Sequence, residues 1–329
     1  MALHSLEIVM AASEAVAGSD KRRLTSMRPF AEGDLLVGAT RIRDAEVDDH
    51  AGDGRILQLD AQLKPKGVLW VEGTTHLVGG LEFAPDGTLW ATDPWSYQVI
   101  NVSPEGVQLP NRRFADRSLG HIFFTDDETV WLCETFVGVQ SESAINTVLP
   151  VLPGEEARLG DGDLYHCTQD GKPLQRYTTE THGGMAGFIG LSHAELMPDG
   201  RTLVYVSETG PRLMRYDIEA GEQLPDLLAY PEGQYKMFFD LAVDADGNVV
   251  ACMGNAVVVI DAAGNIVHSV TPPGDFGWSV IRGAGKDGQY YVANWFTGAI
   301  ILLDLASGEV LAETAIDPKC VSGMARYPG

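Results

Sequence analysis

The sequence lacks the features of a nucleic-acid-binding or membrane-spanning protein. It carries 23 lysines and arginines against 46 aspartates and glutamates, which gives a net charge of −23 at pH 7. Phosphate backbones and anionic lipid surfaces select for basic patches, which so acidic a chain does not favour. No apolar run approaches the roughly 20 residues that cross a bilayer. We therefore expect neither nucleic acid nor a membrane among its partners.

Cysteine is scarce, and an export signal is not apparent. The cysteines show neither paired spacing nor a CxxC motif: Cys133, Cys167, Cys252 and Cys320. Free buried thiols are typical of a reducing compartment, which predicts a cytoplasmic location. The first residues lack a basic stretch, and Glu7 and Glu14 interrupt their apolar part, which argues against a signal peptide. Their spacing predicts a partly helical N-terminal segment over residues 1–30.

The chain is rich in short apolar runs separated by tight turns. The stretch Phe238–Val270 contains such runs divided by Asp246-Gly247-Asn248 and Ala263-Gly264-Asn265. Because glycine supplies the positive φ of hairpin turns, this pattern predicts a sheet of four antiparallel strands. Related units begin near Gly79, Gly120, Ser192 and Ser279. A four-stranded unit that recurs about every 40 residues is typical of a β-propeller blade.

The two ends of the chain complement each other. Asp34–Thr40, Gly54–Gln58 and Gly67–Val71 make three strands of a first blade that lacks its innermost strand. The chain ends in CVSGMARYPG, which has the pattern of an innermost strand with nothing after it. Pairing the two would close a ring and remove exposed sheet edges. The sequence therefore predicts an all-β, six-bladed β-propeller over residues 31–329, closed by a C-terminal strand that completes the N-terminal blade.

Aligning the blades places polar residues at the ends of a central channel. Inner strands line the channel, and their starts share a face with the ends of the second strands. The strand-start positions hold Gly80, His121, His193, Asp240 and Ser322, with Trp278 or Ser279 in blade 6. The second-strand ends hold Asp93, Glu134, Glu208 and Asn294, with Thr40 and Asn255 nearby in blades 1 and 5.

Histidines and carboxylates that converge in this way predict a cation site. We expect one divalent ion (Zn, Fe, Mn, Ca or Mg) with the ligands His121, His193, Asp240 and Glu208. The ion would polarise a carbonyl and lower the pKa of bound water, with catalysis assigned to His121, His193, Glu134 and Glu208. The alternative is that these side chains only satisfy backbone groups or hold water.

Three long loops are expected to overhang the same face. Arg41–Asp53 carries five acidic residues around His50, Val137–Gly160 contains the apolar string VLPVLPG, and Thr178–Gly190 contains His182. The expected substrate-binding residues are Trp278, Trp295, Asn294, Asp93 and His182. Core packing between blades is the alternative for both tryptophans.

The hairpins at Leu81–Trp90 and Glu195–Tyr205 share the pattern apolar-x-apolar-x-Pro-Asp-Gly followed by Thr-Leu. This pattern resembles the gluconolactonase/regucalcin-like superfamily of six-bladed propellers and is similar to NHL-type propeller lyases. The first resemblance implies a divalent ion held by Glu, Asn and Asp at strand ends, with lactones opened by metal-bound water. Here only Asp240 is of the expected type, one step out of register. Histidine-bearing rims look more like propeller lyases of the virginiamycin B lyase and amidoglycolate lyase types, in which a metal and a His or Glu pair eliminate across C–O or C–N bonds.

Three functions remain open at this point. The first is a metal-dependent enzyme that hydrolyses a lactone or ester of a small organic substrate. The second is a lyase in which a His/Glu acid–base pair cleaves a C–O, C–N or C–C bond. The third is a non-catalytic propeller that binds a ligand or protein through Val137–Gly160. The expected partner is a small molecule, with a homodimer left open.

Overall fold

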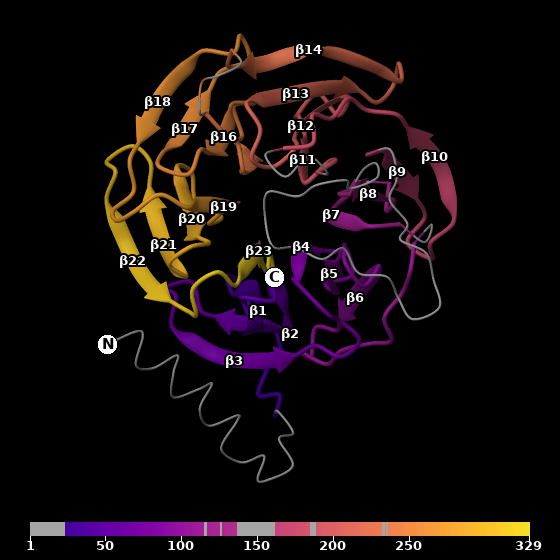
Figure 1. Cartoon of the computed structure of the whole chain (residues 1–329), viewed down its shortest axis with the longest axis vertical. Helices are drawn as coiled ribbons and strands as arrows, with labels where there is room; N and C mark the ends of the chain where they lie inside the picture. Colours follow the sequence, from indigo (N-terminus) through magenta and orange to yellow (C-terminus); the bar gives the residue numbers. More distant parts are fainter. Residues whose placement is uncertain are drawn as a thin grey trace.

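The computed structural model describes residues 24–114, 117–125, 127–136, 162–184, 189–231, 234 and 236–329. Throughout these ranges the regular secondary structure is strand alone. Six antiparallel sheets are arranged radially around one axis, as the view in Figure 1 shows. No helix of these ranges is long and apolar enough to span a membrane. The predicted all-β propeller with six blades is confirmed.

In blades 1 to 3 the strands follow one another from the axis outward. Blade 1 contains β23 (Val321–Arg326), β1 (Leu35–Asp44), β2 (Asp48–Leu59) and β3 (Pro65–Trp70). Blade 2 contains β4 (Gly79–Phe83), β5 (Leu89–Asp93) and β6 (Gln98–Val102). Blade 3 contains β7 (Leu119–Phe124), β8 (Val130–Glu134), β9 (Leu164–Cys167) and β10 (Pro173–Tyr177).

Blades 4 to 6 follow the same order. Blade 4 contains β11 (His193–Leu196), β12 (Thr202–Val206), β13 (Arg212–Asp217) and β14 (Glu222–Ala229). Blade 5 contains β15 (Asp240–Val243), β16 (Val249–Cys252), β17 (Val257–Ile260) and β18 (Ile266–Val270). Blade 6 contains β19 (Trp278–Gly283), β20 (Gln289–Asn294), β21 (Ala299–Asp304) and β22 (Val310–Ala315).

Ring closure occurs as the sequence predicts. The C-terminal strand β23 pairs antiparallel with β1, with Leu35 opposite Arg326 and Val37 opposite Met324. Side chains between blades then complete the core: Val37 and Met324 lie in one buried cluster with Val280 of blade 6. Apolar area buried between blades is the main stabilising term of such a ring. All four cysteines are buried and free, as expected.

The predicted loop Arg41–Asp53 is wrong, because the strands of blade 1 continue through it. β1 and β2 pair from Arg41 opposite Asp53 to Asp44 opposite Asp48. The hairpin projects beyond the sheet, so its strands carry polar residues on both faces and lack the apolar alternation by which strands are recognised. In blade 2, bridges from Val99 to Arg112 and from Val102 to Gln108 stand where the other blades have a fourth strand.

Two other expectations fall largely outside the described residues. Val137–Gly160 lies outside them entirely, as do residues 1–23 of the N-terminal segment. Residues 24–30 are described and contain neither helix nor strand. They run beside β3, where the Ser26 amide donates to the Val68 carbonyl at 2.8 Å.

Glycine permits the close approach of two inner strands near the axis. Gly80 on β4 has φ +56°, and a Cβ there would lie 2.4 Å from the Gly120 carbonyl oxygen on β7. Gly200, in the β11–β12 turn, has a similar φ of +66°, but a Cβ there would meet nothing within 4 Å. The two positions therefore separate the cost of backbone conformation from the cost of crowding.

We expect Gly80→Ala to lower the free energy of unfolding more than Gly200→Ala. Both substitutions carry the cost of a left-handed alanine, roughly 1 kcal/mol. Gly80→Ala adds crowding against Gly120, which costs about 1–3 kcal/mol more. Thermal and urea unfolding of the two variants against the wild type measure the difference. Equal losses in the two variants would show that β4 and β7 do not approach as closely as described.

Candidate functional site

Four successive inner strands, each from its own blade, bring charged and ionisable side chains together at the axis. His121 comes from β7, and its ring centroid lies 5.5 Å from that of His193 on β11. His193 Nε2 lies 3.9 Å from Oδ1 of Asp240 on β15. The same Oδ1 lies 3.6 Å from Nη1 of Arg282 on β19. The predicted meeting of His121, His193 and Asp240 is therefore found, with a guanidinium beside them.

Three glutamates complete this group. Glu195 Oε1 lies 3.8 Å from Arg282 Nη1. Glu82 on β4 is close enough to Arg282 for its charge to be felt, and Glu208, after β12, is close enough to Asp240. We call these residues the axial cluster: Glu82, His121, His193, Glu195, Glu208, Asp240 and Arg282.

The two histidines of the axial cluster are neutral bases at pH 7. Burial, followed by the charges of Arg282 and His193, holds the pKa of His121 well below its usual value. Burial also lowers the pKa of His193, although Asp240 opposes this effect. Within the described residues, neither ring nitrogen of His121 has a hydrogen-bond partner, nor does Nδ1 of His193. Both rings therefore offer a lone pair to another molecule.

The glutamates of the axial cluster hold their protons to unusually high pH. Burial raises the pKa of Glu195 to about 8, while the charge of Arg282 lowers it and the charges of Glu82 and Asp240 raise it by smaller amounts. Burial and the charge of Asp240 raise the pKa of Glu208 to about 7. Burial likewise raises the pKa of Glu82. Near neutral pH the cluster thus contains carboxylic acids as well as imidazole bases, the pairing that proton transfer needs.

The predicted metal ligands do not fit a resident divalent cation as they are arranged. Asp240 accepts hydrogen bonds from the Leu241 amide at 2.7 Å and the Ile281 amide at 2.9 Å. The guanidinium of Arg282 also faces this carboxylate, so a cation bound there would lie against a like charge. Among the described residues, the group of three whose ligand atoms lie within 4.8 Å of one another is Asp48, Asp49 and His50, on the blade 1 hairpin. The axial side chains therefore do not form such a group of three among the described residues.

Glu134 is not brought into the axial cluster. Its Oε2 accepts from the Gly162 amide at 3.0 Å and the Asp163 amide at 3.1 Å, and Arg117 lies 3.6 Å from Oε1. The side chain therefore fixes the connection into β9. Glu134 was predicted to be catalytic because it ends a second strand. A polar residue at such a place can instead satisfy backbone donors, as Glu134 does.

Asp93 and Asn294 also serve turns. Asp93 accepts from the amides of Thr75 at 2.8 Å and Trp95 at 3.0 Å. Asn294 accepts from the Thr297 amide at 3.1 Å and donates to the Asp275 carbonyl at 3.0 Å. Each side chain is at most 1 % exposed, so in this structure both are engaged with backbone rather than presented to a ligand.

The remaining predicted residues lie at three different places. The His182 ring fills the space above Gly210, where a Cβ would lie 1.5 Å from it, and its Nδ1 accepts from the Gly184 amide. Trp278 is 2 % exposed and packs between blades 5 and 6, which is the core alternative. Trp295 lies on the rim, where its ring stacks on His50.

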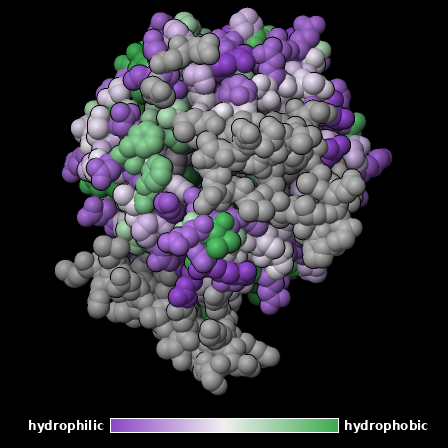
Figure 2. All heavy atoms as spheres, viewed as in Figure 1, coloured by the Kyte–Doolittle hydropathy of each residue, from purple (hydrophilic) through white to green (hydrophobic). Residues whose placement is uncertain are grey.

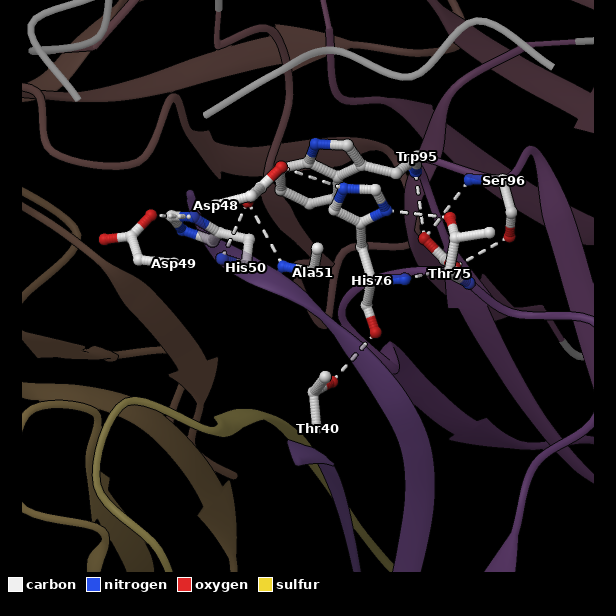
Figure 3. A network of polar contacts seen from close by, with 10 residues as sticks. Thr40, Asp48, Asp49, His50, Ala51, Thr75, His76, Trp95 and Ser96 are labelled. Atoms are coloured by element: carbon white, nitrogen blue, oxygen red, sulfur yellow. Dashed lines mark hydrogen bonds and ion pairs between the residues drawn. The ribbon is translucent and has the colours of Figure 1, made fainter. Parts of the chain in front are cut away.

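A stacked column of rings on the rim was not predicted. We call it the ring column: His76, Trp95, His50 and Trp295, whose successive centroids are 5.3, 5.4 and 5.7 Å apart. His50 Nδ1 lies 2.6 Å from Asp49, and His76 Nε2 lies 3.3 Å from Asp48 (Figure 3). The column joins the blade 1 hairpin to blades 2 and 6.

Sequence reasoning missed three residues of the axial cluster, and alternation along the inner strands could have revealed two of them. Side chains two residues apart share one face of a strand. Glu82 and Glu195 follow the strand-start positions Gly80 and His193 by two residues. Arg282 lies at the corresponding place in blade 6, where the irregular start of β19 hides the alignment.

Comparisons with known proteins show the fold. No protein-family model and no curated protein matches the chain. A protein of unknown function from Bacteroides caccae is similar, with a TM-score of 0.62 and 12% identity over 91% of this chain and 100% of that one. A chain of a nidogen/laminin complex has a TM-score of 0.60 and 13% identity over 88% of this chain and 97% of that one. A catalytically inactive virginiamycin B lyase from Staphylococcus aureus with quinupristin has a TM-score of 0.55 and 14% identity, over 93% of this chain and 96% of that one.

The raised pKa of Glu195 predicts a pH-dependent effect of Glu195→Gln on stability. The folded state retains this proton up to about pH 8, whereas the unfolded chain releases it near its ordinary pKa of 4.5, so the free energy of unfolding of the wild type falls as the pH rises from about 5 to 8. Glutamine mimics the protonated acid and escapes this penalty. We expect the stability of the variant relative to wild type to increase by about 1 kcal/mol per pH unit in that window and then level off. Denaturant unfolding at a series of pH values measures it.

The exposed Glu309 supplies the matched control. Glu309→Gln should change stability little, and by the same amount at pH 5 and pH 9. If Glu195→Gln behaves like this control, then Glu195 ionises freely and the protonated state assigned to it is wrong.

Proposed function

We propose that the axial cluster catalyses an elimination, so that the protein is a propeller lyase acting on a small organic substrate. The observation that carries the proposal is the coexistence of two neutral imidazoles, protonated carboxyls and a guanidinium in one buried group. This set supplies a base, an acid and a stabiliser of negative charge from the chain itself. A virginiamycin B lyase among the similar folds supports the same reaction class.

The reaction can be written with residues of the axial cluster alone. His121 or His193 removes a proton from the carbon next to a substrate carbonyl, and the C–H electron pair becomes the new C=C bond. Arg282 stabilises the negative charge that develops on the carbonyl oxygen. The bond to the leaving group on the neighbouring carbon breaks, and Glu208 or Glu195 protonates the departing atom. No water is consumed.

In this scheme Asp240 positions His193 and Arg282. Its carboxylate is fixed by two backbone amides and lies between His193 and Arg282. A fixed negative charge there keeps the guanidinium oriented and favours a protonated His193 after proton removal. Asp240 therefore supports the base without needing to touch the substrate.

We expect His121→Asn and His193→Asn to lower turnover at least about 100-fold for whichever ring is the base, because that is the usual contribution of a positioned base. The substrates to screen are esters whose alcohol carbon lies β to a carbonyl, beside γ- and δ-lactones. Reactions in ¹⁸O-water, followed by mass spectrometry, should give an alkene product without ¹⁸O. His268→Asn, on the outer strand β18, is the control and should retain full turnover.

Two results would contradict the elimination. Incorporation of ¹⁸O would establish hydrolysis, the reaction that the gluconolactonase-like resemblance implies. Absence of turnover with every substrate, with ligand binding lost only on deletion of residues 137–160, would favour a non-catalytic binding propeller.

Elemental analysis tests the metal prediction directly. Because Arg282 faces Asp240, we expect no stoichiometric divalent metal in the purified protein, dialysed without chelator, and the same in His121→Ala/His193→Ala. About one equivalent in the wild type that disappears in the double variant would establish the predicted site and restore metal-assisted hydrolysis as the leading function.

A further inference from the structure

Aromatic rings form a continuous arc on the rim, from blade 5 across blade 6 to the ring column. Phe239, Phe276, Phe296 and Trp295 follow one another with centroid distances of 5.9, 6.1 and 5.0 Å. Trp295 then stacks on His50 of the ring column at 5.7 Å. We call the first four rings the aromatic arc.

Two rings of the aromatic arc are open to solvent and rest on glycine. Phe276 is 43% exposed and Phe296 is 46% exposed. A Cβ at Gly254 would lie 2.1 Å from the Phe276 ring, and one at Gly277 would lie 2.5 Å from the Phe296 ring. The backbone is thus shaped to receive both rings, so they form a supported platform rather than loosely exposed side chains.

The inner end of the aromatic arc adjoins the axial cluster. Phe239 directly precedes Asp240, and its carbonyl lies close enough to His193 to influence the pKa of that ring. At the axis, Arg282 Nε and both ring nitrogens of His121 are buried and have no hydrogen-bond partner within the described residues. The Arg282 Nε–H and the single N–H of the neutral His121 ring are buried donors, and such donors cost stability unless a ligand satisfies them. A ligand with an acceptor oxygen would do so.

We propose that the protein binds a neutral aryl carbonyl compound, an amide or ester in which a short chain joins an aromatic ring to the carbonyl. The ring stacks on Phe276 and Phe296, and the carbonyl oxygen accepts hydrogen bonds from Arg282 and His121. A neutral ligand is favoured over an anion because the chain has a net charge of −23. The inference rests on the proposed function in that both use the axial cluster, but binding requires no turnover.

The size of the exposed platform favours a small molecule over a protein. A stable protein interface buries about 800 Å² on each partner, far more than two rings provide. On the face drawn in Figure 2, the coloured surface is mostly purple or white, and green is confined to small patches. The platform is therefore matched to a ligand of about one or two rings.

Binding of matched probes to the full chain tests the inference. We would measure the Kd of 3-phenylpropanamide and of 3-cyclohexylpropanamide by calorimetry, with saturation-transfer NMR to show which protons contact the protein. The phenyl probe should bind about three- to tenfold more tightly, since ring–ring contacts contribute roughly 0.5–1.5 kcal/mol beyond buried area. Phe276→Leu/Phe296→Leu keeps the apolar volume and should abolish this preference. His121→Asn should weaken both probes equally.

Leu311→Ala is the control, because Leu311 is 42% exposed on the outer strand β22. It should leave both Kd values unchanged. The inference is overturned if neither probe binds the wild type, if the two probes bind equally, or if the preference survives in Phe276→Leu/Phe296→Leu. It is also overturned if that double variant changes the association state seen by light scattering, since the platform would then be a protein contact.

The two proposals fail in distinguishable ways. Ring-selective binding without turnover of any substrate would leave this inference standing and remove the lyase. Turnover of aliphatic substrates that is unaffected by Phe276→Leu/Phe296→Leu, with no ring-selective binding, would leave the lyase and remove the aryl ligand.

Discussion

Closure of the ring by β23 is the constraint on which the rest of the structure depends. The pairing of β23 with β1 joins the last strand of the chain to the first and fixes all six inner strands around one axis. His121 and Arg282 are separated by about half of the chain, and ring geometry brings both to the same small group. The chemistry of the axis is therefore a consequence of closure, and it would disappear with it.

Burial then decides which residues of the axial cluster, brought together by ring closure, carry a charge. If every group of the axial cluster except its histidines were ionised, four carboxylates would face one guanidinium in a buried place. Burying unpaired charge is more costly than holding a proton, so the glutamates retain theirs and the imidazoles stay neutral. Asp240 keeps two amide hydrogen bonds and Arg282 as partners. One electrostatic balance thus produces acids, bases and a fixed ion pair together.

Much of the fold could be predicted because it is encoded locally. Turn glycines and apolar runs mark each hairpin, and the strand-start positions correctly united His121, His193 and Asp240. The local sequence does not show which way a side chain at a strand end points. Glu134 and Asp93 turn toward backbone amides and away from the axis. The hairpin over Arg41–Asp53 escaped prediction because its strands lack apolar alternation, and the stacking of His50 on Trp95 and Trp295 is long-range.

The site consists of two layers with different physical origins. Inner strands, locked into sheets, hold every residue of the axial cluster except Glu208, which follows β12, so its geometry is largely set by the ring. The rim is assembled from side chains of the blade 1 hairpin and of segments that follow β5 and β20, joined by stacking rather than by strand pairing. Ring contacts are individually weak and tolerate small displacements. Under the proposed function, the scaffold would fix the reactive groups, while recognition at the rim would depend on contacts that can adapt to the ligand.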